Sequence, residues 1–309
     1  MHKALCTILL IVVFVQTSCA QSTSSFDTSD SLRYLNIPER RENAMTGSAF
    51  VRQVTGMSIE ERETAVVREI LSGNVPSFSR KLRSLKVSQT IKEGTCDLIY
   101  FAACDYMAIG SDQDYLYIPL TPSTAQYLAD ILDCSLPTES MVDHIYANSE
   151  FTLVPQPIPP SEKMTSVPVF DQHSDSIKQQ ISLLEFDRSA NDLIAGHKKD
   201  IILSNKIYDP EITGGRVVIY GWHKSETSPI QPAYNGHTAR YADYSHGVRL
   251  ISQTALLNGV PIPLEDILKD PVLSVLLSSE GVINKPHYPE SKYLLQQEAG
   301  FKDYESRRE

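Results

Sequence analysis

Four histidines lie within 50 consecutive residues, and this clustering is the main sign of chemistry in the sequence. They are His197, His223, His237 and His246. A neutral imidazole can transfer a proton or ligate a metal ion near neutral pH, an aspartate can orient the ring, and an arginine can bind a carboxylate through two hydrogen bonds. Asp243 and Arg249 supply an acid and a guanidinium beside the last of these histidines.

We predict that folding brings these side chains into one pocket that faces solvent. Its catalytic group consists of His223, His237, Asp243, His246 and Arg249. The wall that contacts the ligand consists of His197, Lys198, Lys199, Asp200, Trp222 and Ser245. His223 and His246 would act as acid/base or ligand groups. Asp243 would orient one imidazole, and Arg249 would hold a carboxylate of the substrate.

Other interpretations of the same residues stay open. Zinc chemistry needs three protein ligands and an open fourth position, and His237, Asp243 and His246 supply three within ten residues. Neither the H-E-x-x-H nor the C-x-x-C spacing is present, so zinc is a candidate cofactor on residue types alone. Ser245, His246 and Asp243 are the residue types of a nucleophilic Ser-His-Asp triad. Neighbouring side chains in a strand point to opposite faces, however, so Ser245 and His246 can meet only on a turn. Histidines that hydrogen-bond inside a polar core would explain the cluster without any catalysis.

Hydrophobic periodicity and turn signals predict the elements that must position these side chains. A capping box at Ser58 and Glu61 predicts a helix that ends before Gly73. Further helices are predicted from Pro122 to Cys134, from Thr138 to Asn148 and from Asp171 onward. Strands are predicted at 81–89, 97–109, 115–120, 200–204, 216–222 and 248–252. Each clustered histidine lies at or just past a predicted strand end, where binding sites are usually built.

The order of strands, then helices, then strands again predicts an α+β fold with a largely antiparallel sheet and flanking helices. Residues 33–309 are expected to form a single α+β domain, with a Pro-rich surface crossing at 155–168. The dinucleotide-binding and P-loop glycine motifs do not occur, so the sequence offers no phosphate cradle.

The first residues have the pattern of a secretory signal. A short positive start is followed by a largely apolar run of twelve residues, Ala4–Val15, which is too short to span a bilayer. Residues 1–20 are therefore predicted to be a signal peptide and 21–32 a flexible leader. Cleavage after Ala20 and lipid attachment at Cys19 are equally compatible with the pattern. We therefore expect a secreted, periplasmic or cell-envelope protein whose only membrane attachment would be a lipid anchor at Cys19.

The net charge limits the kinds of partner that the protein can bind, and the number of cysteines limits its disulfide bonds. The chain has a net charge of -10 and shows no basic stripe, so no nucleic-acid partner is expected. Cys96, Cys104 and Cys134 are too few for a disulfide framework. Three buried free thiols are favoured over one disulfide with one thiol left over.

The segment Ser245-His246-Gly247-Val248-Arg249, preceded by the strand that ends at His223, resembles the active-site pair of the L,D-transpeptidase family of cell-wall enzymes. That family carries S-H-G-C-x-R, in which the cysteine attacks a peptide carbonyl and the adjacent histidine activates it. Here Val248 stands in place of the cysteine, and the arginine comes one residue earlier. The resemblance therefore implies a relative that has lost or changed the chemistry.

A broader resemblance covers most of the predicted mature chain. The run from Asp105 to Thr138, together with GHKKD, YGWH and DYSHGVRL, resembles an uncharacterised group of exported bacterial proteins. We expect an exported protein with a His/Asp/Arg pocket that acts on cell-wall peptide, or another polar extracellular ligand, by hydrolysis or acyl transfer. The alternative is a non-catalytic extracytoplasmic ligand-binding module that kept a cleft but no nucleophile.

Overall fold

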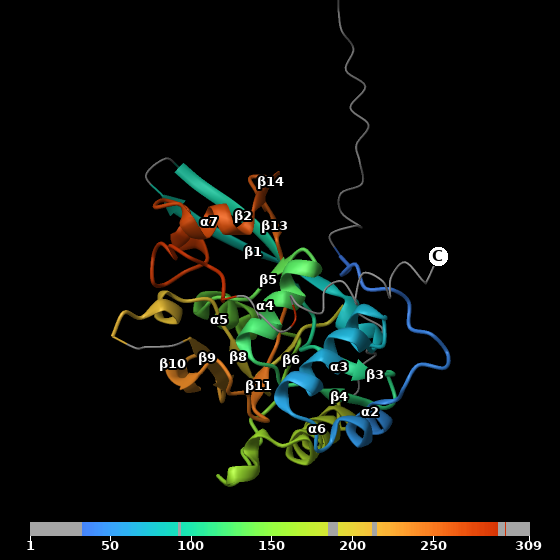
Figure 1. The fold of residues 1–309 in the computed structure, drawn as a ribbon. Helices are drawn as coiled ribbons and strands as arrows, with labels where there is room; N and C mark the ends of the chain where they lie inside the picture. Colours follow the sequence, from blue (N-terminus) through green and yellow to red (C-terminus); the bar gives the residue numbers. More distant parts are fainter. Residues whose placement is uncertain (1–32, 92–93, 185–190, 212–214, 290–293, 295–309) are drawn as a thin grey trace, which may run out of the picture.

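The structure is a computed structural model that describes residues 33–91, 94–184, 191–211, 215–289 and 294. The predicted signal peptide at 1–20, with Cys19, and the leader at 21–32 lie outside the described residues. In the part of the chain that is described, no helix is both long enough and apolar enough to cross a membrane. The fold is a mixed α+β arrangement with mostly antiparallel sheets, which confirms the predicted class (Figure 1).

The larger sheet is built on one long antiparallel hairpin. Its strands run in the order β14 (Val260–Pro263), β13 (Thr254–Leu257), β2 (Gly94–Ala103), β12 (Ile251–Ser252) and β5 (Cys134–Ser135), with β1 (Leu82–Ile91) also paired to β2. All of these pairings are antiparallel. The predicted strand at 97–109 is split in two, because residues 104–107 leave the ladder before β3 (Ala108–Gly110) begins. β3 then forms an antiparallel hairpin with β4 (Tyr115–Tyr117).

A second, four-stranded sheet carries most of the predicted site residues. Its order is β10 (Pro229–Thr238), β9 (Arg216–His223), β8 (Lys199–Ile201) and β11 (His246–Gly247). β11 is parallel to β8, whereas the other neighbours are antiparallel. A short parallel pair joins β6 (Phe151–Thr152) to β7 (Ile194–Ala195). The predictions missed β10 because Pro229 and Pro232 interrupt its pattern, yet an edge strand tolerates proline.

Helices cover the hairpins and the second sheet. They are α2 (Gly47–Val54), α3 (Ile59–Leu71), α4 (Pro122–Ile131), α5 (Glu139–Ala147), α6 (Val167–Ser182) and α7 (Leu264–Lys269), with 3-10 turns at Ser77–Arg80, Glu162–Thr165, Asn205–Tyr208 and Ser274–Leu276. Figure 1 shows α2, α3 and α6 around the β3–β4 hairpin, while α5 packs against β9. The predicted capping box is present, since Ser58 and Glu61 exchange side-chain and main-chain hydrogen bonds at the start of α3.

The Pro-rich segment is extended over only part of its predicted range. Residues 153–161 have no regular structure, but a 3-10 turn follows and α6 begins at Val167, four residues before the predicted start. Pro168 therefore lies in the first turn of a helix, which corrects the prediction that the crossing continues to 168. Proline is tolerated there because the first N–H groups of a helix have no intrahelical acceptor.

One buried carboxylate joins two helices. Glu63 of α3 accepts hydrogen bonds from the main-chain N–H of Thr121 at 2.6 Å and from the hydroxyls of Thr121 and Thr124 at 2.7 and 2.5 Å, at the start of α4. Glu63→Ala would leave three buried donors without their acceptor, so we expect the free energy of unfolding to fall by about 3 kcal/mol. Urea denaturation would measure the change, with Glu42→Ala at an exposed position as the control. A loss no larger than that of the control would contradict this role for Glu63.

Candidate functional site

A left-handed corner at the end of β9 decides where His223 points. Gly221 has φ +105° and Trp222 has φ +58°, a conformation that is strained for a bulky residue. In a regular strand Tyr220 and His223 would face opposite sides. The corner reverses this alternation, and both side chains reach the same carboxylate, that of Asp143 on α5. The Tyr220 hydroxyl donates to Asp143 Oδ1 at 2.7 Å, and His223 Nε2 lies 2.9 Å from the same oxygen.

His223 borders a small cavity between α5 and the sheet. Asp200 and Arg249 also line it, together with Tyr106, Val142, Ile145, Tyr146, Ala195 and Gly196. The cavity has a volume of about 10 Å³, which is the room that the centre of one water molecule needs. His223 stacks on the ring of Tyr146 at 4.6 Å, which fixes the plane of the imidazole beside the cavity.

Arg249 is fully committed to contacts within the fold. Its terminal nitrogens donate to the main-chain oxygens of Ala103 and Ile194 at 2.6 and 2.7 Å. Its Nε lies 3.8 Å from Asp200 Oδ1, and the guanidinium lies over the Tyr106 ring at 4.2 Å. The side chain is 1% exposed. The guanidinium that was predicted to hold a substrate carboxylate therefore joins β2, β7 and β8 in this structure.

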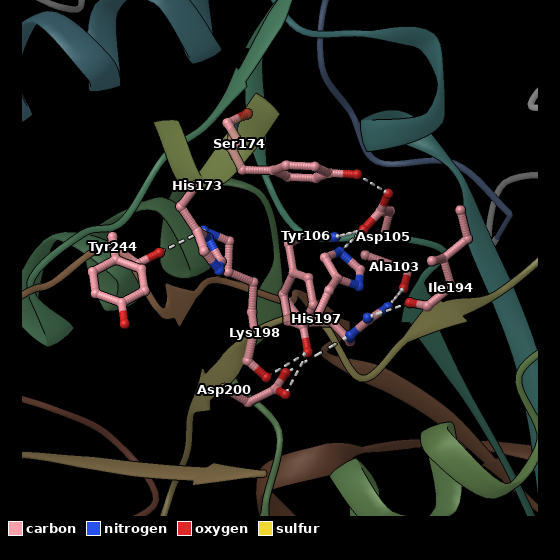
Figure 2. A network of polar contacts seen from close by, with 12 residues as sticks. Ala103, Asp105, Tyr106, His173, Ser174, Ile194, His197, Lys198, Asp200 and Tyr244 are labelled. Atoms are coloured by element: carbon pink, nitrogen blue, oxygen red, sulfur yellow. Dashed lines mark hydrogen bonds and ion pairs between the residues drawn. The ribbon is translucent and has the colours of Figure 1, made fainter. Parts of the chain in front are cut away.

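A chain of buried polar contacts continues from this arginine (Figure 2). The Tyr106 hydroxyl donates to Asp200 Oδ2 at 2.7 Å. On the other side, His197 Nε2 lies 3.0 Å from Asp105 Oδ1, and the Tyr117 hydroxyl donates to Asp105 Oδ2 at 2.6 Å. Figure 2 shows the Tyr106 and His197 rings between the two carboxylates. Burial lowers the pKa of His197, so its ring is neutral near pH 7.

Lys198 lies in the same network without an ion pair among the described residues. Its ammonium nitrogen is 2.6 Å from the main-chain oxygen of Tyr244 and 3.1 Å from Nδ1 of His173. The residue is 1% exposed, and burial lowers the pKa of Lys198 to about 7, although the charges of Asp243 and Asp105 oppose the shift. Gly247 is required beside it, because a Cβ there would lie 2.6 Å from the Tyr106 ring and 2.7 Å from Lys198 Cβ.

A further group lies on the face of the second sheet that carries Lys199, and it touches the surroundings of Lys198 through the contact of Trp222 with His173. Lys199 and His246 are register partners on β8 and β11, so their side chains project to the same side. The Lys199 ammonium lies over the ring of Trp222 at 4.9 Å. His237 stacks on Tyr241 at 4.1 Å, and the edge of Tyr241 meets His246 at 5.8 Å. Lys199, His237 and Tyr241 are half-buried, whereas Trp222 is buried as part of the core.

Asp243 and His246 lie at the base of this group. Asp243 Oδ1 accepts from the N–H and the hydroxyl of Ser245 at 2.8 and 2.6 Å, and its Oδ2 accepts from the Tyr241 hydroxyl at 3.1 Å. His246 is fully buried, and neither ring nitrogen has a hydrogen-bond partner among the described residues. Burial lowers the pKa of His246 to about 4 against the opposing charge of Asp243. Burial works against ionisation of Asp243 too, but His246 and the Ser245 hydrogen bonds lower the pKa of this carboxyl.

The predicted site residues therefore fall into three groups. We call them the cavity group (Asp200, His223, Arg249), the lysine group (His197, Lys198) and the outer group (Trp222, Lys199, His237, Asp243, Ser245, His246). Neighbouring residues such as 199 and 200 belong to different groups because they face opposite sides of the strand. Within the described ranges, no set of three His, Cys, Asp or Glu side chains is arranged to hold a metal ion. Cys96, Cys104 and Cys134 are free and buried, as predicted.

Several residues of these groups were not singled out from the sequence. Asp143, Asp105, Tyr106, His173 and Tyr241 all contact predicted residues directly. Asp143 and His173 lie on helices that were predicted from the spacing of their apolar residues, without attention to their polar residues. Asp105, Asp143 and His173 lie 92, 80 and 25 positions from the residues that they contact, so spacing along the chain does not relate them. Tyr241 is only two positions from Asp243 and could have been considered with it.

Comparisons with family models, with curated proteins and with solved structures find no match to this chain. What the three groups do is therefore inferred from their geometry and from the amino-acid sequence.

Proposed function

We propose that this protein is an exported cell-envelope hydrolase that cleaves amide bonds in polar cell-wall peptides, with His246 as the general base. The observation that carries the proposal is the state of His246, a buried imidazole with two unpartnered nitrogens beside the Asp243 carboxylate. Buried polar atoms without partners are rare in folded proteins and are often explained by a ligand or a catalytic role.

The outer group supplies what hydrolysis requires. His246 takes a proton from water, the water oxygen bonds to the substrate carbonyl carbon, the carbon–nitrogen bond breaks, and the proton passes to the leaving amine. Lys199 offers positive charge for the oxyanion on the same face of the sheet. Tyr241 and His237 are half-buried above His246, so displacement of the Tyr241 side chain would admit the substrate.

Hydrolysis is favoured over acyl transfer because the outer group has no aligned protein nucleophile. The Ser245 hydroxyl donates to Asp243, and Val248 occupies the position of the cysteine in the resembling motif. The lack of an aligned nucleophile in the outer group also favours a second candidate function, a non-catalytic module that binds a polar extracellular ligand. Export rests on the signal pattern at residues 1–20 in both cases.

Incubation with purified cell-wall peptide fragments tests the proposal. We expect the unmodified protein to cleave amide bonds, and His246→Gln to lower kcat/KM by about 100-fold or more because the general base is lost. Mass spectrometry would identify the products. His287→Gln is the matched control, since His287 pairs with Asp130 at the surface and belongs to none of the three groups.

Two outcomes would reject the hydrolase. Equal activity of His246→Gln and the unmodified protein would remove His246 from the reaction. Fragments that bind but stay intact would instead support the binding module, and calorimetry on the same fragments would then measure the affinity.

A further inference from the structure

The cavity group contains a carboxylate oxygen that the described residues leave without a partner. Asp200 Oδ1 is buried and makes no hydrogen bond, while Oδ2 accepts from the Tyr106 hydroxyl. The nearest cation is Arg249, whose Nε lies 3.8 Å from Oδ1, beyond hydrogen-bond distance. A buried carboxylate oxygen with no donor costs about 1–3 kcal/mol or more, so the fold is expected to satisfy it in another way.

The cavity beside Asp200 has the size and the polarity of a water site. Its volume of about 10 Å³ fits one water molecule, and Asp200, His223, Arg249 and Tyr106 contribute polar groups to its wall. Apolar cavities of this kind stay dry, whereas polar ones with two to four hydrogen-bonding partners hold ordered water. The unpartnered Oδ1 gives that water an acceptor.

His223 lies between this cavity and solvent. Its ring is 2% exposed, and its Nε2 contacts Asp143, whose side chain is 46% exposed. An imidazole can take a proton at one nitrogen and release one at the other. The strained corner at Gly221 and Trp222 is what turns the ring toward both Asp143 and the cavity, and strain of this kind collects at functional positions.

We propose that the cavity is a binding site for a single water molecule that hydrogen-bonds Asp200 Oδ1, and that this water with His223 and Asp143 forms a proton path from solvent to Asp200. Such a path has a use, because burial raises the pKa of Asp200 to about 6, against the opposing effects of Arg249, the Tyr106 hydrogen bond and His223. Asp200 therefore exchanges a proton close to neutral pH. The proposal is independent of the hydrolase, since the outer group lies on the opposite face of the sheet.

A high-resolution crystal structure of the unmodified protein at pH 8 tests the water site directly. One ordered water within hydrogen-bond distance of Asp200 Oδ1 is the expected result. An empty cavity would overturn the proposal.

A cavity-filling variant tests the same site in solution. Val142→Ile adds one methylene to the cavity wall and should displace the water, so the Asp200 carboxylate loses a donor and its pKa should rise by about 1. Carboxyl ¹³C NMR would follow the titration. Val154→Ile, at a residue that is 63% exposed and does not line the cavity, is the control. An unchanged pKa in Val142→Ile would overturn the water site.

The proton path has its own readout. His223→Phe keeps an aromatic ring to stack on Tyr146 but cannot carry a proton, so protonation of Asp200 after a pH jump should slow by about tenfold or more. Infrared detection of the carboxyl C=O stretch would measure the rate. An unchanged rate would overturn the path. Neither NMR nor infrared measurement depends on catalytic activity, so failure here and failure of the proposed hydrolase are distinguishable.

Discussion

Replacement of Arg249 by methionine is expected to lower the free energy of unfolding by about 3–5 kcal/mol, the largest single loss that we anticipate. The change removes both donors from the main-chain oxygens of Ala103 and Ile194 and the only close cation from Asp200 among the described residues. An uncompensated charge and two orphaned carbonyls would then remain in the interior, because Ala103, Ile194 and Asp200 are all buried.

Urea denaturation at pH 7 would measure this loss. Arg52→Met, at an exposed position on α2, is the control and should change stability by less than about 0.5 kcal/mol. Arg249→Lys should recover little, because an ammonium cannot reach two carbonyls and a carboxylate with the planar geometry of a guanidinium. A variant with methionine at 249 that unfolds within about 1 kcal/mol of the unmodified protein would refute the structural role of this arginine.

Lys198→Met is expected to change the pH dependence of stability more than any other substitution. Burial lowers the pKa of Lys198 from 10.5 in a free side chain to about 7. Between these values the unfolded chain binds more protons than the folded chain, so this residue makes the free energy of unfolding rise with pH. Below about pH 7 both states are protonated, and the full cost of the buried ammonium is present.

The measurement compares unfolding free energies of the two proteins from pH 7 to 10.5. Relative to Lys198→Met, the unmodified protein should gain on the order of 3–5 kcal/mol across this range. Methionine keeps a similar stem length, so packing against Tyr117 changes little. Lys224→Met, at an exposed position, serves as the control and should leave the profile unchanged. Parallel profiles for Lys198→Met and the unmodified protein would show that Lys198 is not titrated in this window.

Elements with strong local signals were predicted closely. The capping box at Ser58 starts α3, and Pro122 starts α4 as its first residue. Both signals act through hydrogen bonds and backbone angles within a single turn, so they need no distant partner. β10 was missed for the opposite reason. Two prolines weaken its local pattern, and only its pairing with β9 makes it a strand.

The candidate site was predictable by residue type but not by arrangement. Asp243 and His246 are three residues apart in the sequence, and the structure keeps both in one group with Lys199. By contrast, the acid that contacts His223 is Asp143, which lies 80 residues earlier, and the acid that contacts His197 is Asp105, which lies 92 residues earlier. Contacts over such separations depend on helix and sheet packing, which spacing along the chain does not encode.

Residue types and local patterns are enough to predict the α+β class, the starts of α3 and α4 and the concentration of imidazole, carboxylate and guanidinium groups toward the C-terminal half. These follow from residue chemistry and from backbone preferences that act over a few residues. The division of these residues into three groups appears only in the folded chain. The physical reasons are the alternation of side chains across β8, which separates Lys199 from Asp200, and the left-handed corner at Gly221 and Trp222, which turns His223 to the cavity face.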